Sequence, residues 1–308
     1  MSAIGRNLRG ALLALGAFAV FSAHDVSVKA LGGAYHVAQI VFFAALLGLP
    51  AVFVLLMRDP EPGTIWPRSP AIVFVRSGAV LVSALSAFFA FAEIPLAQAY
   101  AIFFSTPILV TLLAVPLLGE KVGIRRATAI AVGMAGVLIV LRPGQSEFGL
   151  GHLSALVAAL SSALTAVLTR RIGTSERAVV VLLYPMLGNI AVLGAFMPFV
   201  YRPMEGGDFL LVTLVALGSV GGMVLIIAAY RAAEAVVVAP MQYSQIVWAV
   251  FYGALFFEES PDAITLVGAA VVMGSGIYIL LREQKLHGAP VAPAAPASTA
   301  GVGLRPRR

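Results

Sequence analysis

The sequence predicts an all-α integral membrane protein with ten transmembrane helices, arranged as two inverted five-helix repeats. Composition is the first reason, because the 308 residues are 60% hydrophobic and only 11% charged, unlike a soluble domain. The second is that apolar stretches of about 20 residues, long enough to cross a hydrocarbon core of about 30 Å, recur ten times. The third is an internal repeat.

The ten apolar stretches follow one another with short connections, which favours a compact bundle. They are expected at Leu8–Val28, Tyr35–Met57, Pro70–Ala92, Leu96–Leu118, Ile124–Leu141, His152–Thr169, Ala178–Val200, Phe209–Tyr230, Val236–Phe257 and Ala263–Leu281. Gly and Pro mark the turn at Gly32 and the loop before Pro70.

The first stretch follows Arg6 and Arg9, as the core of a secretory signal would. A cleavable signal has a short apolar core and a small-residue cleavage site. Here the run continues through Asp25 and Lys29 without such a boundary. We therefore expect a transmembrane helix.

The fourth and fifth stretches, within 97–141, resemble the ninth and tenth, within 236–281. At an offset of 139 the alignment pairs Ser105 with Ser244 and Glu120 with Glu259, and one inserted residue then pairs Gly136 with Gly276. Such self-similarity indicates a duplication. Five helices per copy is an odd number, so the second copy enters the membrane from the opposite side and the repeats are inverted.

These boundaries divide the chain into four parts. Residues 1–141 form the first repeat and 142–150, which contain Pro and Gly, form a linker. Residues 151–286 form the second repeat. Residues 287–308 are mostly Ala, Pro, Gly and Arg, cannot bury an apolar face, and are expected to be a disordered tail.

The basic residues predict the orientation. If the helices alternate, 17 of the 20 Lys and Arg residues fall on one side and only Lys29, Arg142 and Arg202 on the other. Under the positive-inside rule, both termini are then cytoplasmic in an inner (plasma) membrane. The net charge of +6 is a topology signal and does not indicate a nucleic-acid partner.

Polar side chains within apolar helices are costly, and most face a bundle interior or an aqueous cavity. In the ninth stretch, Gln245, Trp248 and Tyr252 recur at helical spacing on one face, with Gln242 beside it. An amide and two aromatic rings suit a planar or zwitterionic organic ligand. The alternative is that the two aromatic residues belong to an interfacial belt or pack between helices.

The fourth stretch carries the corresponding candidates Gln98, Tyr100 and Ser105, and Pro107 is expected to bend the helix there. Asn189 in the seventh stretch is a further candidate cavity residue. Bent helices at corresponding points of two repeats are typical of transport sites.

The first stretch carries the ionisable cluster His24, Asp25 and Lys29. Asp25 and Lys29 are four residues apart, so the spacing predicts an ion pair on one face. One interpretation is a gate or a proton-coupling site, and the other is an ion pair at the end of the helix. Glu120 and Glu259 are interpreted as structural residues that accept hydrogen bonds from the first turn of the next helix.

This arrangement resembles the drug/metabolite transporter superfamily in its ten-helix EamA-type branch, over about residues 8–282. The first copy carries Pro107, Pro116, Gly119 and Glu120, followed by a Gly-rich helix, whereas the second has Ile246 in place of Pro107 and Glu258 in place of Gly119. The resemblance implies a secondary carrier of small organic molecules that works by alternating access.

The candidate cavity is rich in amide and aromatic groups and has few fixed charges, which favours an amino-acid-like, S-adenosylmethionine-like or riboflavin-like substrate. Coupling to protons follows from the interpretation in which His24 or Asp25 takes the proton, and no cofactor is expected. A passive channel is the alternative, followed by an intramembrane enzyme. The chain has no ring of like polar groups, no nucleophile paired with a base, no nucleotide-binding loop and no cysteine. We therefore expect the lipid bilayer and a small organic substrate as partners, with no metal, nucleic acid or enzymatic activity.

Overall fold

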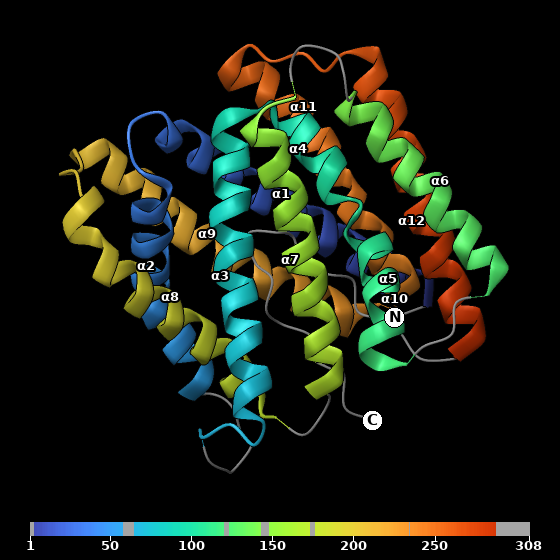
Figure 1. Ribbon diagram of the computed structural model, residues 1–308, viewed down its shortest axis with the longest axis horizontal. Coiled ribbons are helices and arrows are strands. Elements are labelled where there is room, and N and C mark those ends of the chain that lie inside the picture. The colour runs from blue at the N-terminus through green and yellow to red at the C-terminus, as the bar shows by residue number, and fades with distance from the viewer. Residues whose placement is uncertain are drawn as a thin grey trace.

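The computed structural model describes residues 3–57, 65–119, 123–142, 148–172, 176–233 and 235–287. All regular elements in these ranges are helices (Figure 1). In order they are α1 (Ala3–Gly32), α2 (Val37–Met57), α3 (Pro70–Glu93), α4 (Leu96–Phe103), α5 (Thr106–Leu118), α6 (Ile124–Leu141), α7 (Leu150–Ile172), α8 (Ala178–Val200), α9 (Gly206–Ala232), α10 (Ala235–Val238), the 3₁₀ helix η1 (Ala239–Tyr243), α11 (Ser244–Phe257) and α12 (Ala263–His287).

Within the described residues, seven helical segments are long and apolar enough to span a membrane. The continuous segment Leu96–Leu118, formed by α4 and α5, is one of them. Two shorter apolar helices, Ala127–Leu141 and Ala263–Tyr278, lie within α6 and α12. The predicted all-helical membrane protein is thereby confirmed at the level of its fold class.

The fourth predicted helix is interrupted, and its chemistry explains where. Pro107 has no N–H to donate to the carbonyl of Phe103, so the regular hydrogen-bond ladder fails there. The Thr106 hydroxyl donates to that carbonyl instead, at 2.6 Å. Phe104 and Ser105 form the turn between α4 and α5.

The ninth predicted helix is interrupted as well. Pro240 lies in the 3₁₀ turn η1, and α11 begins at Ser244, the residue that the repeat pairs with Ser105. The two segments also end alike. Gly119 after α5 (φ 69°) and Glu258 after α11 (φ 56°) both adopt the left-handed conformation that closes a helix.

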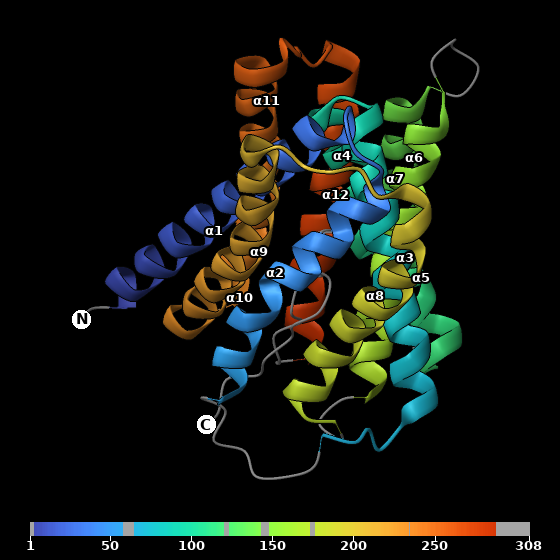
Figure 2. The same cartoon turned by 90° about the vertical axis from the view of Figure 1, so that its left-hand side faces the viewer.

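Helices distant in sequence pack side by side. α1 lies along α9, α3 along α7, α2 along α8 and α6 along α12, while α4 contacts α11 near the centre. Figures 1 and 2 show the long helices running between two ends of the bundle, with the end of α11 and the start of α12 at the top.

Glycines permit the closest approaches. A Cβ on Gly222 of α9 would lie 2.5 Å from the Phe21 ring of α1, and one on Gly268 of α12 would lie 2.9 Å from the Gly136 carbonyl oxygen of α6. The Gly-rich segments therefore act as packing surfaces. Gly221 of α9 and Gly274 of α12 differ, because a Cβ at either position would meet nothing within 4 Å.

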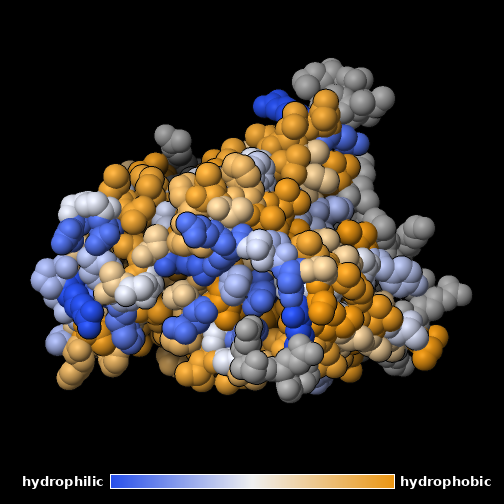
Figure 3. All heavy atoms as spheres, turned by 90° about the horizontal axis from the view of Figure 1, so that it is seen from above, coloured by the Kyte–Doolittle hydropathy of each residue, from blue (hydrophilic) through white to orange (hydrophobic). Residues whose placement is uncertain are grey.

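The outer surface carries many large apolar side chains, as expected for helices in contact with lipid. Phe74 and Phe199 are each 80% exposed. Seen from the end at the top of Figure 1, hydrophilic residues gather over part of the face and hydrophobic residues flank them (Figure 3).

Candidate functional site

A buried carboxylate lies where α1 faces α4. Asp25 is 1% exposed, and its Oδ2 accepts a hydrogen bond from the Tyr100 hydroxyl, which is itself buried. Its Oδ1 lies 2.7 Å from Nδ1 of His24, and the Ser22 hydroxyl lies 3.4 Å from that of Tyr100. A buried carboxylate is costly unless its oxygens have polar partners, and here each oxygen of Asp25 has one.

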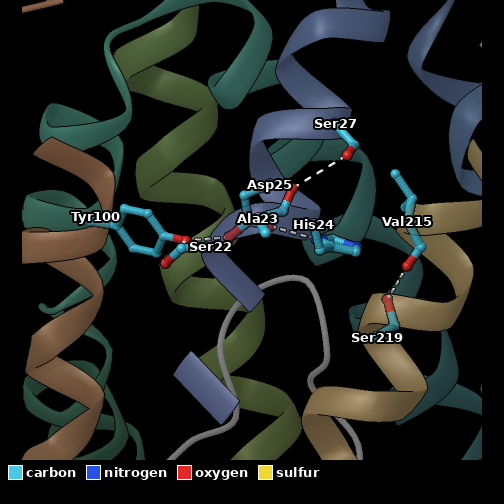
Figure 4. A network of polar contacts seen from close by, with 8 residues as sticks. All are labelled: Ser22, Ala23, His24, Asp25, Ser27, Tyr100, Val215 and Ser219. Atoms are coloured by element: carbon cyan, nitrogen blue, oxygen red, sulfur yellow. Dashed lines mark hydrogen bonds and ion pairs between the residues drawn. The ribbon is translucent and has the colours of Figure 1, made fainter. Parts of the chain in front are cut away.

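Figure 4 shows how the helix arranges these groups. Tyr100 reaches across from α4 toward Ser22 and Asp25, whereas the His24 ring points to the other side, toward α9. There the His24 Cβ lies close to Gly218, and the ring meets the edge of Phe88 at a centroid distance of 5.7 Å. A bulkier residue at Gly218 would displace His24 from this position.

The His24 ring has a second nitrogen that Asp25 does not bind. When Nδ1 donates to Asp25, the remaining nitrogen Nε2 is an acceptor. Nε2 is buried and has no hydrogen-bond partner among the described residues.

The two interrupted helices meet beside this cluster. The rings of Phe104 and Tyr243, at the two interruptions, are 5.0 Å apart in an edge-to-face contact, and the Gln245 side chain of α11 lies beside the Tyr100 hydroxyl. Several buried polar atoms at this crossing have no partner in the described part of the chain. They are Ser105 Oγ, Ser244 Oγ and Gln245 Nε2. The Tyr243 hydroxyl also has no partner in the described residues, and it lies against Gly276 of α12.

Unpartnered buried donors and acceptors are costly in a purely structural core. Their concentration at the crossing of the interrupted helices therefore favours a binding site, where a ligand or water supplies the missing hydrogen bonds. We name this cluster the central site and define it as Ser22, His24, Asp25, Tyr100, Ser105, Tyr243, Ser244 and Gln245.

The structure brings together only part of the predicted set. Gln242 is buried in η1, next to the central site in sequence. Gln98 lies elsewhere, because its Oε1 is 3.2 Å from Nε2 of His152 at the start of α7. Asn189 is buried in α8 with an unpartnered Oδ1, and no described contact joins it to Asp25.

The aromatic residues of α11 lie along a different direction. Trp248 and Tyr252 are stacked with ring centroids 6.1 Å apart, and Tyr252 also contacts Phe256, which is 59% exposed. Trp248 packs against the apolar cluster formed by Phe18 and Phe21 of α1. This placement favours the packing interpretation for Tyr252 and leaves Trp248 at the edge of the central site.

The predicted Asp25–Lys29 pair is wrong. Lys29 instead pairs with Glu259, Nζ to Oε1 at 2.8 Å, and donates to the carbonyls of Phe91 and Ile94. Glu259 and the free carbonyls at the end of α3 bind the ammonium group instead, and Asp25 is occupied by Tyr100 and His24.

The predicted partner of Glu259 also needs correction. Its Oε2 accepts the backbone N–H of Leu96 at 3.0 Å, so it caps α4 of the first half, whereas Asp262 accepts the N–H of Thr265 in the first turn of α12. A hydrogen bond from Arg142 lowers the pKa of Asp262 to about 2. Glu120, the counterpart of Glu259, lies outside the described residues.

Three members of the central site, Ser22, Tyr243 and Ser244, were absent from the predicted set. Ser22 carries a signal, because it lies three residues before Asp25 on the same helical face. Ser244 was noticed only as the counterpart of Ser105. Arg76 is buried among α3, α7 and α8, where it donates to Thr169 Oγ1 at 2.7 Å and to the Val181 carbonyl at 2.8 Å.

Comparison with known proteins gives consistent results. The profile of the EamA-like transporter family matches residues 8–142 and 149–282. The S-adenosylmethionine uptake transporter of Rickettsia felis is 27% identical over 270 residues, which cover 86% of this chain and 90% of the relative. The riboflavin transporter of Rhizobium johnstonii is 28% identical over 255 residues, covering 80% and 81% of the two chains.

The pseudopaline exporter CntI of Pseudomonas aeruginosa is 28% identical over 287 residues, covering 90% of this chain and 97% of the relative. A solved crystal structure with 19% sequence identity has a TM-score of 0.56 and covers 93% of this chain and 100% of its own. That structural likeness concerns the fold alone.

Proposed function

The chain belongs to the EamA-like transporter family and is a secondary transporter of small organic metabolites. We propose that it binds its substrate at the central site and moves it across the membrane by alternating access. The observation that carries this proposal is the buried Asp25–Tyr100 contact surrounded by unpartnered polar groups. Buried ionisable residues in membrane helices commonly mark transport pathways.

The proposed architecture is ten spanning segments in two inverted repeats, residues 1–141 and 151–286. The helix contacts support the repeat symmetry. If each helix of α1–α6 is exchanged with its counterpart in α7–α12, the α1–α9 contact becomes the α7–α3 contact, and the α2–α8 and α6–α12 contacts are unchanged. The matched interruptions at Ser105 and Ser244 support it further. Residues 142–150 then connect the repeats and 287–308 follow as a tail, and both stretches lie largely outside the described residues.

We place both termini in the cytoplasm and the protein in the plasma (inner) membrane, on the basis of the basic residues. Under this orientation Lys29, Leu96 and Glu259 lie at the outer end. Arg76 and the end of α7 lie toward the cytoplasm.

A pair of single-cysteine variants tests this orientation. Gly33→Cys and Gly123→Cys suit the test, because the chain contains no natural cysteine and a Cβ at either position meets nothing within 4 Å. Applied to intact cells, an impermeant maleimide is expected to label Gly33→Cys and to leave Gly123→Cys unlabelled until the membrane is opened. The reverse pattern would contradict the orientation.

The central site supports a zwitterionic or planar organic substrate. It offers one carboxylate, one amide and several hydroxyl groups beside aromatic rings, and it holds no Arg or Lys among its residues. Amino-acid-like, S-adenosylmethionine-like and riboflavin-like molecules fit this chemistry, and the names of the relatives point the same way. A phosphorylated solute would call for several cationic side chains.

Proton coupling at His24 and Asp25 is part of the proposal. The imidazole nitrogen Nε2 is the position for the proton, and Asp25 stabilises the resulting imidazolium. The titratable and charged groups of this cluster are His24, Asp25 and Tyr100, whereas Gln245, which faces it from α11, does not titrate.

Substitutions of Gln245 and Trp248 distinguish a substrate-binding role of this face of α11 from a packing role. Gln245→Ala removes a buried hydrogen-bonding group, which costs about 1–3 kcal/mol when its partner is left unpaired, or roughly 5- to 150-fold in affinity. Trp248→Ala is expected to weaken a planar substrate more than a small aliphatic one. Substrate-dependent thermal shift and transport at matched expression measure both effects. Unaltered affinity in both variants with a lower melting temperature would assign this face of α11 to packing.

Uptake screens in auxotrophic cells that express the protein test the substrate class. We expect growth or uptake to depend on a zwitterionic or planar metabolite. Robust transport of a multiply phosphorylated solute would refute the proposed chemistry of the central site.

A further inference from the structure

The buried apolar side chains form one large cluster that includes the end of the bundle near Lys29, and two smaller separate clusters lie toward the other end. A single large cluster joins α1, α2, α3, α7, α8 and α9 near the end where Lys29 lies, and it continues along α4, α5, α6, η1, α11 and α12. Toward the other end, the described residues form two separate clusters, one between α1, α9 and α10 around Phe18 and one between α3, α7 and α8 around Val73. In Figure 2 the lower ends of α1 and α9 lie apart from those of α3 and α5.

A cross-half ion pair lies at the end of the bundle that the large cluster includes. Lys29 of α1 is 11% exposed and Glu259 of the second half is 18% exposed, so the pair is largely withdrawn from water. Lys29 donates to two carbonyls where α3 ends, and Glu259 accepts the N–H of Leu96 where α4 begins. The Phe257 ring lies 5.4 Å from the ammonium group.

Each charge is matched to the helix end that it meets. A cation favours the negative C-terminal end of a helix, and an anion favours the positive N-terminal end. The pair thus fastens α1 and the α11–α12 connection onto the α3–α4 junction, which belongs to the first half. The two charges keep these partners only while α1, the end of α3, the start of α4 and the α11–α12 connection remain together.

The ion pair is one helical turn from the central site on two helices at once. Lys29 follows Asp25 by four residues on α1, and Leu96 precedes Tyr100 by four on α4. Four residues rise about 6 Å along a helix. The Lys29–Glu259–Leu96 contact therefore forms a layer over the Asp25–Tyr100 contact.

We propose that Lys29 and Glu259 are the gating residues at this end of the pathway, closed in the structure, and that they open when α4 and Tyr100 move. This inference rests on the proposed central site. Opening this end requires both charges to leave their helix ends, so the Lys29–Glu259 contact holds the closed state, and a shift of α4 at Tyr100 is transmitted to Leu96.

The test measures accessibility, which does not require a known substrate. Ser105→Cys is the reporter in the central site, and an impermeant thiol reagent is applied from the side on which Lys29 lies. Glu259→Gln removes the charge and Glu259→Ala removes the cap as well, so we expect labelling to accelerate in that order, by roughly 10- to 150-fold for Ala. Asp262→Asn is the matched control, because the exposed Arg142–Asp262 pair also joins the two halves at this end; it is expected to leave the rate unchanged.

A cross-link tests the gate in a second way if these variants fold poorly. Lys29→Cys with Glu259→Cys, joined by a short bifunctional thiol reagent, is expected to block transport and labelling from this side, and labelling from the opposite side is expected to persist. The same double variant without the cross-linking reagent is the control, and its labelling from this side is expected to persist. Equal labelling rates in the Glu259 variants and the parent, or transport through the cross-linked Lys29–Glu259 pair, would overturn the gate. Either result would leave the central site to be judged separately by substrate binding to the parent protein.

Discussion

Asp25→Asn is expected to reduce transport by about 100-fold or more. The change keeps the shape of the side chain but removes the charge that Tyr100 and His24 bind. A hydrogen bond to a buried charged group contributes about 1.5–3 kcal/mol, and 2.7 kcal/mol corresponds to a factor of about 100. In our account the same carboxylate also stabilises a protonated His24, so the response to a pH gradient should disappear with it.

The measurement is initial uptake into proteoliposomes with and without a pH gradient, at matched protein content. Ser27→Ala is a suitable control, because the Ser27 hydroxyl donates only to the Ala23 carbonyl of its own helix in the described contacts. Asp25→Glu restores the charge and is expected to recover part of the activity. Near-parental uptake and an intact pH response in Asp25→Asn would exclude Asp25 from the transport site.

Gly268→Ala is expected to lower the stability of the folded protein by about 1–3 kcal/mol, as for overpacked interiors generally. The new Cβ would lie 2.9 Å from the Gly136 carbonyl oxygen and 3.1 Å from the Val140 nitrogen. Both are backbone atoms of α6 and cannot rotate away, so α6 and α12 must separate. Since these two helices pack mainly on each other, their separation loosens this side of the bundle.

Gly274→Ala on the same helix is the matched control. It meets nothing within 4 Å, so it is expected to be neutral or slightly stabilising through the better helix propensity of Ala. Thermal unfolding of the purified protein in detergent measures both variants. Equal melting temperatures for the two would contradict the close α6–α12 contact.

Apolar length predicted where the helices lie, and seven segments of the described residues are long and apolar enough to cover the hydrocarbon core. Pro107 also predicted the interruption of the fourth helix. The interruption of the ninth was not predicted, since Ile246 occupies the position equivalent to Pro107. There the 3₁₀ turn around Pro240 takes over the role, a few residues earlier in the sequence.

The candidate site was predicted in its composition but not in its pairings. Polar residue types within apolar helices pointed to Asp25, Tyr100 and Gln245, which lie beside one another, and to Ser105, whose binding role stays a prediction. The sequence paired Lys29 with Asp25 because local spacing is visible along one helix. Its actual partner, Glu259, is 230 positions away and depends on where α3 ends and α4 begins. Gln98 was misjudged for the same reason, because its partner His152 belongs to the other half.

Counterflow in proteoliposomes tests the central claim most directly. Vesicles are loaded with an unlabelled zwitterionic or planar metabolite identified by the uptake screen and diluted into a trace of the labelled compound. A carrier that alternates around the central site is expected to accumulate the label transiently above its external concentration, and Asp25→Asn is expected to abolish that overshoot. Simple equilibration of the label without overshoot in the parent protein would indicate a channel and contradict the account.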